Sequence, residues 1–158
     1  MAARDIYCSA NFCRGKVYTK ANKDNQNGNW VYGTPIQCDT FMGKSHENWI
    51  IPMFAIGCNG GWLNIGPRYP VDGKTVTRYT GMDDSKHNRI FENDIIRVTY
   101  NQSENGYDDF QVMYDKNKYK WVIKCFGKEK VTIYDFEWLA SYTNNGDKYV
   151  EVIGNVYD

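Results

Sequence analysis

Four carboxylates gather around one short stretch of the sequence and are its best candidates for chemistry. Asp83 and Asp84 close the segment Tyr79–Asp84, and Glu92 and Asp94 follow shortly afterwards. Several oxygen ligands of this kind hold Mg²⁺, which would support phosphoryl chemistry or hydrolysis. The alternative is structural, because a short carboxylate in a turn accepts hydrogen bonds from nearby backbone N–H groups. We favour this alternative, with the segment as a polar turn between two apolar segments, and predict no metal site.

Other catalytic signals are weak. The two histidines, His46 and His87, each lie in a polar segment, whereas a nucleophilic triad needs a histidine held rigidly beside a serine or cysteine. The glycine-rich stretch 57–61 lacks the lysine of a phosphate-binding loop and suits a hairpin instead. We therefore predict no catalytic residue and no cofactor.

A row of lysines is the best candidate for nucleic-acid binding. The segment Tyr119–Cys125 alternates as a strand, which would place Lys118, Lys120 and Lys124 outward and Tyr119 and the other apolar residues inward. Lysines on one strand face follow phosphates, and exposed aromatic rings stack on bases. Because the lysines and aromatics would then lie on opposite faces, a solvated face is the simpler interpretation, with nucleic acid or a protein partner as alternatives.

Aromatic residues are the second binding signal. Tyrosine and tryptophan suit binding surfaces because they are large, rigid and partly polar, although they also fill cores. The residues that we predict to bind a partner are Trp30, Tyr32 and Tyr79. Together with other aromatic side chains they would line a groove: Trp30, Tyr32, Trp49, Trp62, Tyr69 and Tyr79.

The overall charge argues against a general nucleic-acid binder. The 158 residues carry 19 Lys plus Arg and 19 Asp plus Glu, so the formal net charge is zero. The charge is unevenly placed, with nine basic and five acidic residues in 1–78 against ten and fourteen in 79–158. The absence of a long apolar run or secretion signal predicts no membrane span and a cytoplasmic location. The five cysteines form no Cys-x-x-Cys, which favours free thiols.

Composition and periodicity predict a mostly β fold with minor α content. Tyrosine, valine and isoleucine are abundant, while leucine is rare. The segment Ile95–Tyr100 alternates with Ile96, Val98 and Tyr100 on one face, and Tyr149–Val156 reads as a closing strand. A helix is expected over Asp135–Ser141. We predict one unit over 1–158, with an irregular β-rich half at 1–78 and an SH3-like small barrel at 79–158.

Six motifs in order make the chain resemble the YopX family of small proteins encoded by bacteriophages and prophages. The motifs are Phe12-Cys13-Arg14-Gly15-Lys16, Gly28-Asn29-Trp30-Val31-Tyr32-Gly33, Trp49-Ile50-Ile51-Pro52, Tyr79-Thr80-Gly81-Met82-Asp83-Asp84, the segment Ile90–Ile96, and Glu151-Val152-Ile153-Gly154-Asn155-Val156-Tyr157. Asn93 stands where the family usually has glycine, so we expect a left-handed backbone there. The residues that we assign to a structural signature are Tyr79, Thr80, Gly81, Asp83, Glu92, Asn93, Asp94, Gly154 and Asn155.

The resemblance implies a mainly β fold with an SH3-like portion, but no settled activity. We therefore expect a phage accessory protein in the bacterial cytoplasm that binds a host or phage macromolecule, or itself, and is not an enzyme. The alternatives are a nucleic-acid-binding module, a counter-defence protein that sequesters a signalling nucleotide or inhibits a defence enzyme, and a metal-dependent hydrolase.

Overall fold

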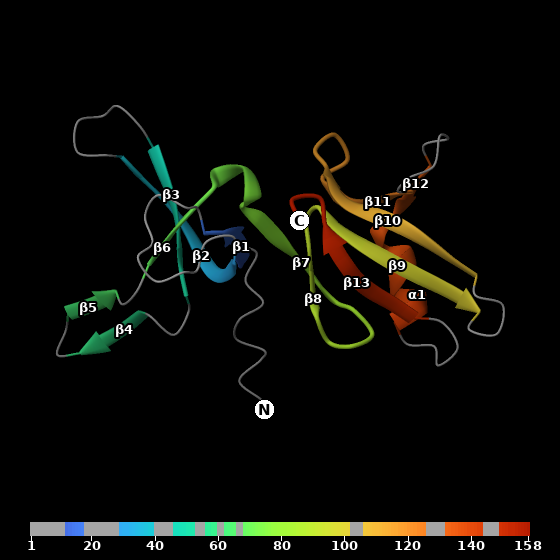
Figure 1. The fold of residues 1–158 in the computed structure, drawn as a ribbon, viewed down its shortest axis with the longest axis horizontal. Helices are drawn as coiled ribbons and strands as arrows, with labels where there is room; N and C mark the ends of the chain where they lie inside the picture. The colour runs from blue at the N-terminus through green and yellow to red at the C-terminus, as the bar shows by residue number, and fades with distance from the viewer. Residues whose placement is uncertain are drawn as a thin grey trace. The chain divides into compact units, whose positions relative to one another are not determined.

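The computed structural model confirms a mostly β protein. It describes residues 12–17, 29–39, 46–52, 56–59, 62–65, 68–101, 106–125, 132–143 and 149–158. The chain forms two compact units, Met1–Tyr79 and Thr80–Asp158, and Figure 1 shows the strands of each. The helical segments in these ranges have three or four residues each, and none of them is long enough to cross a membrane.

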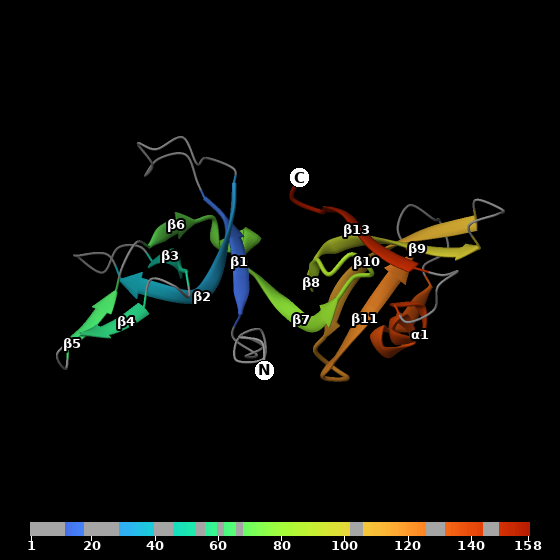
Figure 2. The same cartoon turned by 90° about the horizontal axis from the view of Figure 1, so that it is seen from below.

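The first unit contains an antiparallel sheet that curls back on itself. Its strands run in the order β6-β3-β2-β1-β7-β8, of which β7 continues into the second unit and β8 (Arg89–Phe91) belongs to it, and Figure 2 shows β1 beside β2. Val17, just after β1, forms a bridge with Val71 of the edge strand β6, so the sheet curls until the end of β1 meets β6. The strands are β1 (Cys13–Lys16), β2 (Trp30–Asp39), β3 (His46–Ile51), β6 (Tyr69–Val71) and β7 (Thr77–Asp83).

The core of the first unit lies on one face of this sheet. Cys13, Ile50 and Val71 are buried together, with Val31 and Val76 packed against them. A separate hairpin, β4 (Ile56–Asn59) with β5 (Trp62–Ile65), confirms the hairpin expected at the glycine-rich stretch. A short 3-10 helix, η2 (Gly73–Thr75), precedes β7.

The second unit contains a five-stranded antiparallel sheet in the order β12-β11-β10-β9-β13. The strands are β9 (Asp94–Asn101), β10 (Gly106–Asp115), β11 (Lys120–Cys125), β12 (Ile133–Asp135) and β13 (Tyr149–Asn155). The predicted SH3-like barrel is not confirmed, because within the described ranges β12 and β13 are the two edges of an open sheet. Before it, β7 and β8 (Arg89–Phe91) form a hairpin.

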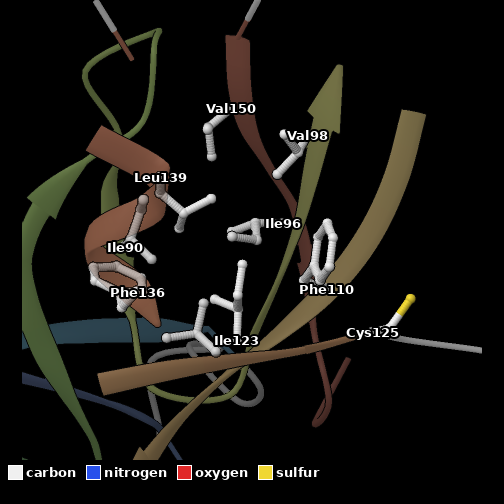
Figure 3. Close-up of a cluster of buried hydrophobic side chains, with 10 residues drawn as sticks. Ile90, Ile96, Val98, Phe110, Ile123, Cys125, Phe136, Leu139 and Val150 are labelled. Atoms are coloured by element: carbon white, nitrogen blue, oxygen red, sulfur yellow. The ribbon is translucent and has the colours of Figure 1, made fainter. Parts of the chain in front are cut away.

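The second core lies between this sheet and a short helical segment. The predicted inward residues Ile96 and Val98 are fully buried, as are Val112 and Ile123. Figure 3 shows Phe136 and Leu139 pointing from the helical segment toward the strand residues of this core. These contacts bury the alternating apolar positions of β9, β10 and β11.

The helical segment differs from the helix predicted over Asp135–Ser141. It is a 3-10 helix, η4 (Phe136–Leu139), followed by one α-helical turn, α1 (Ala140–Thr143). Asp135 belongs to β12 and makes no capping hydrogen bond through its side chain, and Ala140 is exposed. The tighter 3-10 turn allows both Phe136 and Leu139, three residues apart, to enter the core.

An aromatic cluster borders this core. The ring of Trp138 stacks on that of Tyr134, with centroids 5.4 Å apart, and contacts Tyr142 at 4.5 Å. The hydroxyl of Tyr100 donates a hydrogen bond to Asp108, with 3.0 Å between the oxygens. Burial and this hydrogen bond raise the pKa of Tyr100 above its ordinary value.

Candidate functional site

Strand alternation gives the first unit one face that is both cationic and aromatic. Cys13 of β1 and Val31 of β2 point into the core. Their immediate neighbours along each strand therefore point to the other face. Across the β1–β2 pair, Arg14 lies opposite Tyr32 and Lys16 lies opposite Trp30. We call this surface the cationic–aromatic face, and its residues are Phe12, Arg14, Lys16, Trp30, Tyr32 and Tyr79.

The two cations of this face both lie against Trp30. The guanidinium carbon of Arg14 is 4.4 Å from the centroid of the Trp30 ring, and the ammonium of Lys16 is 5.2 Å from it. Both distances are within the range of cation–π attraction. The Trp30 ring is therefore held in place by charge as well as by packing.

Tyr79 joins the face from a distant part of the sequence. β7 pairs with β1, and the backbone N–H of Tyr79 donates a 2.9 Å hydrogen bond to the carbonyl of Phe12. The two rings meet edge to face with centroids 6.3 Å apart. All three predicted binding residues, Trp30, Tyr32 and Tyr79, thus come from the two strands that flank β1 and lie on the same face.

The face has a buried layer and an exposed layer. Phe12 and Arg14 are each only 6% exposed, whereas Tyr32 is 45% exposed and the side chains of Lys16 and Trp30 are half-buried. The buried layer supports the exposed one, because Arg14 contacts Trp30 and also donates a 3.4 Å hydrogen bond to Thr77. A ligand would meet Lys16, Trp30 and Tyr32 first.

Hydrogen bonds around η2 fix the position of β1. The Thr75 hydroxyl accepts from the backbone N–H of Lys16 at 2.8 Å and donates to the carbonyl of Asp72 at 2.7 Å. The Asp72 carboxylate in turn accepts from the N–H of Lys74 at 3.0 Å. These contacts hold Lys16 at the edge of the face.

Phe12, Arg14 and Lys16 of this face were not among the residues predicted from the sequence to bind a partner. Their signal was their alternate spacing in the first motif, which places three such side chains on one face of a strand. Of the other aromatics predicted to line a wider groove, Tyr69 lies opposite the buried Ile50, on the core side of the sheet. Trp49 lies opposite Ile36 of β2, with the Arg68 guanidinium 5.3 Å from its ring, and the side chain of Trp62 lies outside the described residues.

The predicted lysine row is not a single strand face. Lys118 and Tyr119 lie in the turn between β10 and β11, and β11 begins only at Lys120. Tyr119 has a left-handed backbone, with φ of 53°, and is 82% exposed, so its predicted inward position is wrong. Lys118 lies 4.0 Å from Asp115, and Lys120 forms a 2.6 Å ion pair with Asp135. Acidic neighbours therefore offset two of the three lysines.

The Lys120–Asp135 pair gives a pH-dependent prediction. Its hydrogen bond lowers the pKa of Asp135 from the ordinary value of 3.8. Since the pKa is lower in the folded state, the pair stabilises the fold above the ordinary pKa, and this is lost as the pH falls through the lowered pKa. Lys120→Gln is expected to raise the pKa of Asp135, as measured by NMR titration of its carboxyl carbon. Lys124→Gln is the control; an unchanged Asp135 pKa in Lys120→Gln would refute the assignment.

Two of the four clustered carboxylates, Asp84 and Asp94, hold parts of the fold together. Asp84 is 3% exposed and accepts hydrogen bonds from the backbone N–H groups of Lys86, Asn88 and Val152 at 2.8–3.1 Å. Asp94 is fully buried and accepts from Phe91 N–H at 2.7 Å and from the Asn155 amide at 3.0 Å. Within the described ranges, no three His, Cys, Asp or Glu side chains are grouped to hold a metal ion.

The segment Tyr79–Asp84 is a strand rather than the predicted turn. Its residues up to Asp83 belong to β7, and the turn follows at residues 84–88. The Thr80 hydroxyl donates a 2.8 Å hydrogen bond to the carbonyl of Ile90 on β8, and Gly81 adopts φ of 91°. This conformation favours glycine, which accounts for that residue of the signature.

The turn before β9 has the left-handed residue that was expected. Asn93 has φ of 67°, its N–H donates to the carbonyl of Val112 at 2.8 Å, and its carbonyl accepts from Val156 N–H at 3.1 Å. Glu92 lies beside it, half-buried, and Gly154 follows a register shift in β13. These residues join β9, β10 and the end of β13.

Comparison with known proteins identifies the family. No curated protein sequence and no solved structure matches the chain. The sequence model of the family described as YopX protein matches residues 22–158, which include β2 of the cationic–aromatic face, the segment Tyr79–Asp84 and the turn before β9. Since this match covers well over half of the 158 residues, the chain belongs to the YopX family.

Proposed function

We propose that this protein is a non-enzymatic binding module and that the cationic–aromatic face is its binding surface. The observation that carries the proposal is the placement of Trp30, Tyr32 and Tyr79 on one sheet face with Arg14 and Lys16. Tryptophan, tyrosine and arginine are the residue types that contribute most to binding energy at interfaces. Strand pairing holds them in a fixed arrangement before any ligand arrives, which lowers the entropic cost of binding.

The carboxylates and the histidine considered as catalytic candidates favour a binding protein over an enzyme. The carboxylates of Asp84 and Asp94 are occupied by backbone and amide donors that a catalytic role would have to displace. His87 is exposed in a turn, without the rigid surroundings that orient a general base. In this proposal the protein acts as a phage accessory factor in the bacterial cytoplasm, on a host or phage macromolecule or on a second copy of itself.

Site-specific photocrosslinking in bacterial cells tests the proposal. A photoreactive phenylalanine analogue at Tyr32 is expected to form covalent adducts with a macromolecule, because Tyr32 is 45% exposed on the proposed surface. The same analogue at Tyr119 is the control, since this tyrosine is 82% exposed but lies in the second unit. Equal adducts at both positions, or none at Tyr32, would rule out the cationic–aromatic face as the binding surface.

A further inference from the structure

We propose that the ligand of the cationic–aromatic face is single-stranded nucleic acid, an inference that rests on the proposed function. The spacing of the aromatic residues of β2 determines how far apart the bases of such a ligand must lie. Trp30 and Tyr32 are two residues apart on one strand face, so they lie about 6.6 Å apart along β2. This spacing is about twice the 3.4 Å rise between stacked bases of a duplex strand. Only a nucleic-acid strand whose bases are splayed apart could place successive bases on the rings of Trp30 and Tyr32.

The positions of the two cations determine where the phosphates of such a ligand would lie. Lys16 lies directly across the strand pair from Trp30, and its ammonium is 5.2 Å from that ring, so an anion bound beside the ring would lie close to this charge. Arg14 lies across from Tyr32, and its buried guanidinium adds positive charge beneath Trp30. Both cations thus lie beside Trp30, so a phosphate next to a base on that ring would meet positive charge.

The charge of the first unit agrees with an anionic ligand. Residues 1–79 contain nine Lys and Arg against five Asp and Glu, a net charge of +4, although the whole chain is neutral. A local positive field draws in a polyanion even when the net charge of the protein is zero. Stacking on aromatic rings tolerates any base, so little sequence preference is expected.

The expected salt dependence is shallow, which separates this surface from that of a strongly basic protein. One or two phosphates would be neutralised, since Lys16 is partly exposed and Arg14 contributes from below. For single strands, this corresponds to a slope of roughly −0.7 to −1.4 in the logarithm of affinity against the logarithm of salt concentration. Most of the affinity would come from stacking.

Fluorescence anisotropy of the full chain with labelled oligothymidylate and oligouridylate tests the inference. Tyr32→Ala is expected to weaken binding about fivefold or more, because it removes one stacking platform. Tyr32→Phe keeps the ring and should retain most of the affinity, while Lys16→Ala should flatten the salt slope. Tyr119→Ala, which removes an exposed tyrosine of the second unit, should leave binding unchanged.

Several results would overturn the inference. These are no oligonucleotide binding at low salt, equal affinity for a duplex of the same length, or binding that Tyr32→Ala does not weaken. Tighter binding of an acidic peptide such as oligoglutamate would assign the same surface to a protein ligand. If the oligonucleotides do not bind but crosslinking at Tyr32 still yields protein adducts, the nucleic-acid inference fails and the proposed binding function stands.

Discussion

Gly33→Ala is expected to destabilise the first unit by at least about 3 kcal/mol, because the added methyl group has no space. A Cβ at Gly33 would lie 2.0 Å from the carbonyl oxygen of Ile51 and 2.9 Å from the Cα of Pro52. Both are backbone atoms, so no side chain can rotate away. Relief requires β2 and β3 to separate, which breaks the pairing of Thr34 with Ile51. The glycine that ends the second family motif is therefore explained by close packing of two strands.

Hydrogen exchange is the right measurement for Gly33→Ala because it reports each unit separately. Amide protection is expected to fall in β2 and β3 while the strands of the second unit keep theirs. Gly106→Ala is the matched control, since a Cβ at Gly106 would meet no atom within 4 Å. Normal protection of β2 and β3 in Gly33→Ala would show that the two strands do not approach so closely.

The mostly β fold could be predicted because strand periodicity is local. Ile96 and Val98 alternate with polar residues, and the structure buries both. The error at Tyr119 has a simple cause. Alternation was continued through the turn between β10 and β11, where the chain adopts a left-handed backbone and no longer follows the strand. Periodicity thus identified β11 but not its first residue.

The open sheet could not be predicted, because its edges are set by contacts between distant residues. Among the residues that the structure describes, no other strand pairs with the outer side of the edge strand β13, but the turn after β7 covers part of it. Ser85 N–H donates to the carbonyl of Val150 at 2.9 Å, and the Ser85 hydroxyl accepts from Val150 N–H at 3.0 Å. A turn that satisfies a sheet edge leaves no signature in local composition.

The candidate site was predictable only in part for the same reason. The spacing of Trp30 and Tyr32 already places them on one face of a strand, and the same holds for Arg14 and Lys16 within their motif. The pairing of β1 with β2, which brings these two sets together, is a long-range contact. Tyr79 arrives through a further pairing, of β7 with β1. Neither contact can be read from the spacing of residues.

Asp84→Ala is expected to cost roughly 2–4 kcal/mol of stability in the second unit, because several part-buried donors lose their buried acceptor. The Asp84 carboxylate accepts from three backbone N–H groups and from the Asn88 side-chain amide, which is 3.1 Å away. One of these donors, Val152 N–H, belongs to β13, so the carboxylate ties the turn after β7 to the sheet edge. The loss should also loosen the Lys86–Glu151 ion pair, whose 2.5 Å contact spans the same two elements.

The neighbouring carboxylate, Asp83, provides the control that distinguishes a structural role of Asp84 from a catalytic one. Asp83 precedes Asp84 and has the same side chain, but it is exposed at the end of β7. Asp83→Ala should therefore change the urea midpoint of the second unit little, while Asp84→Ala lowers it and increases hydrogen exchange in β13. If both substitutions left stability unchanged, the buried hydrogen bonds of Asp84 would not hold the sheet edge. If Asp84 is needed for amide protection of β13 when no metal is added, its role in this segment is to hold the fold together.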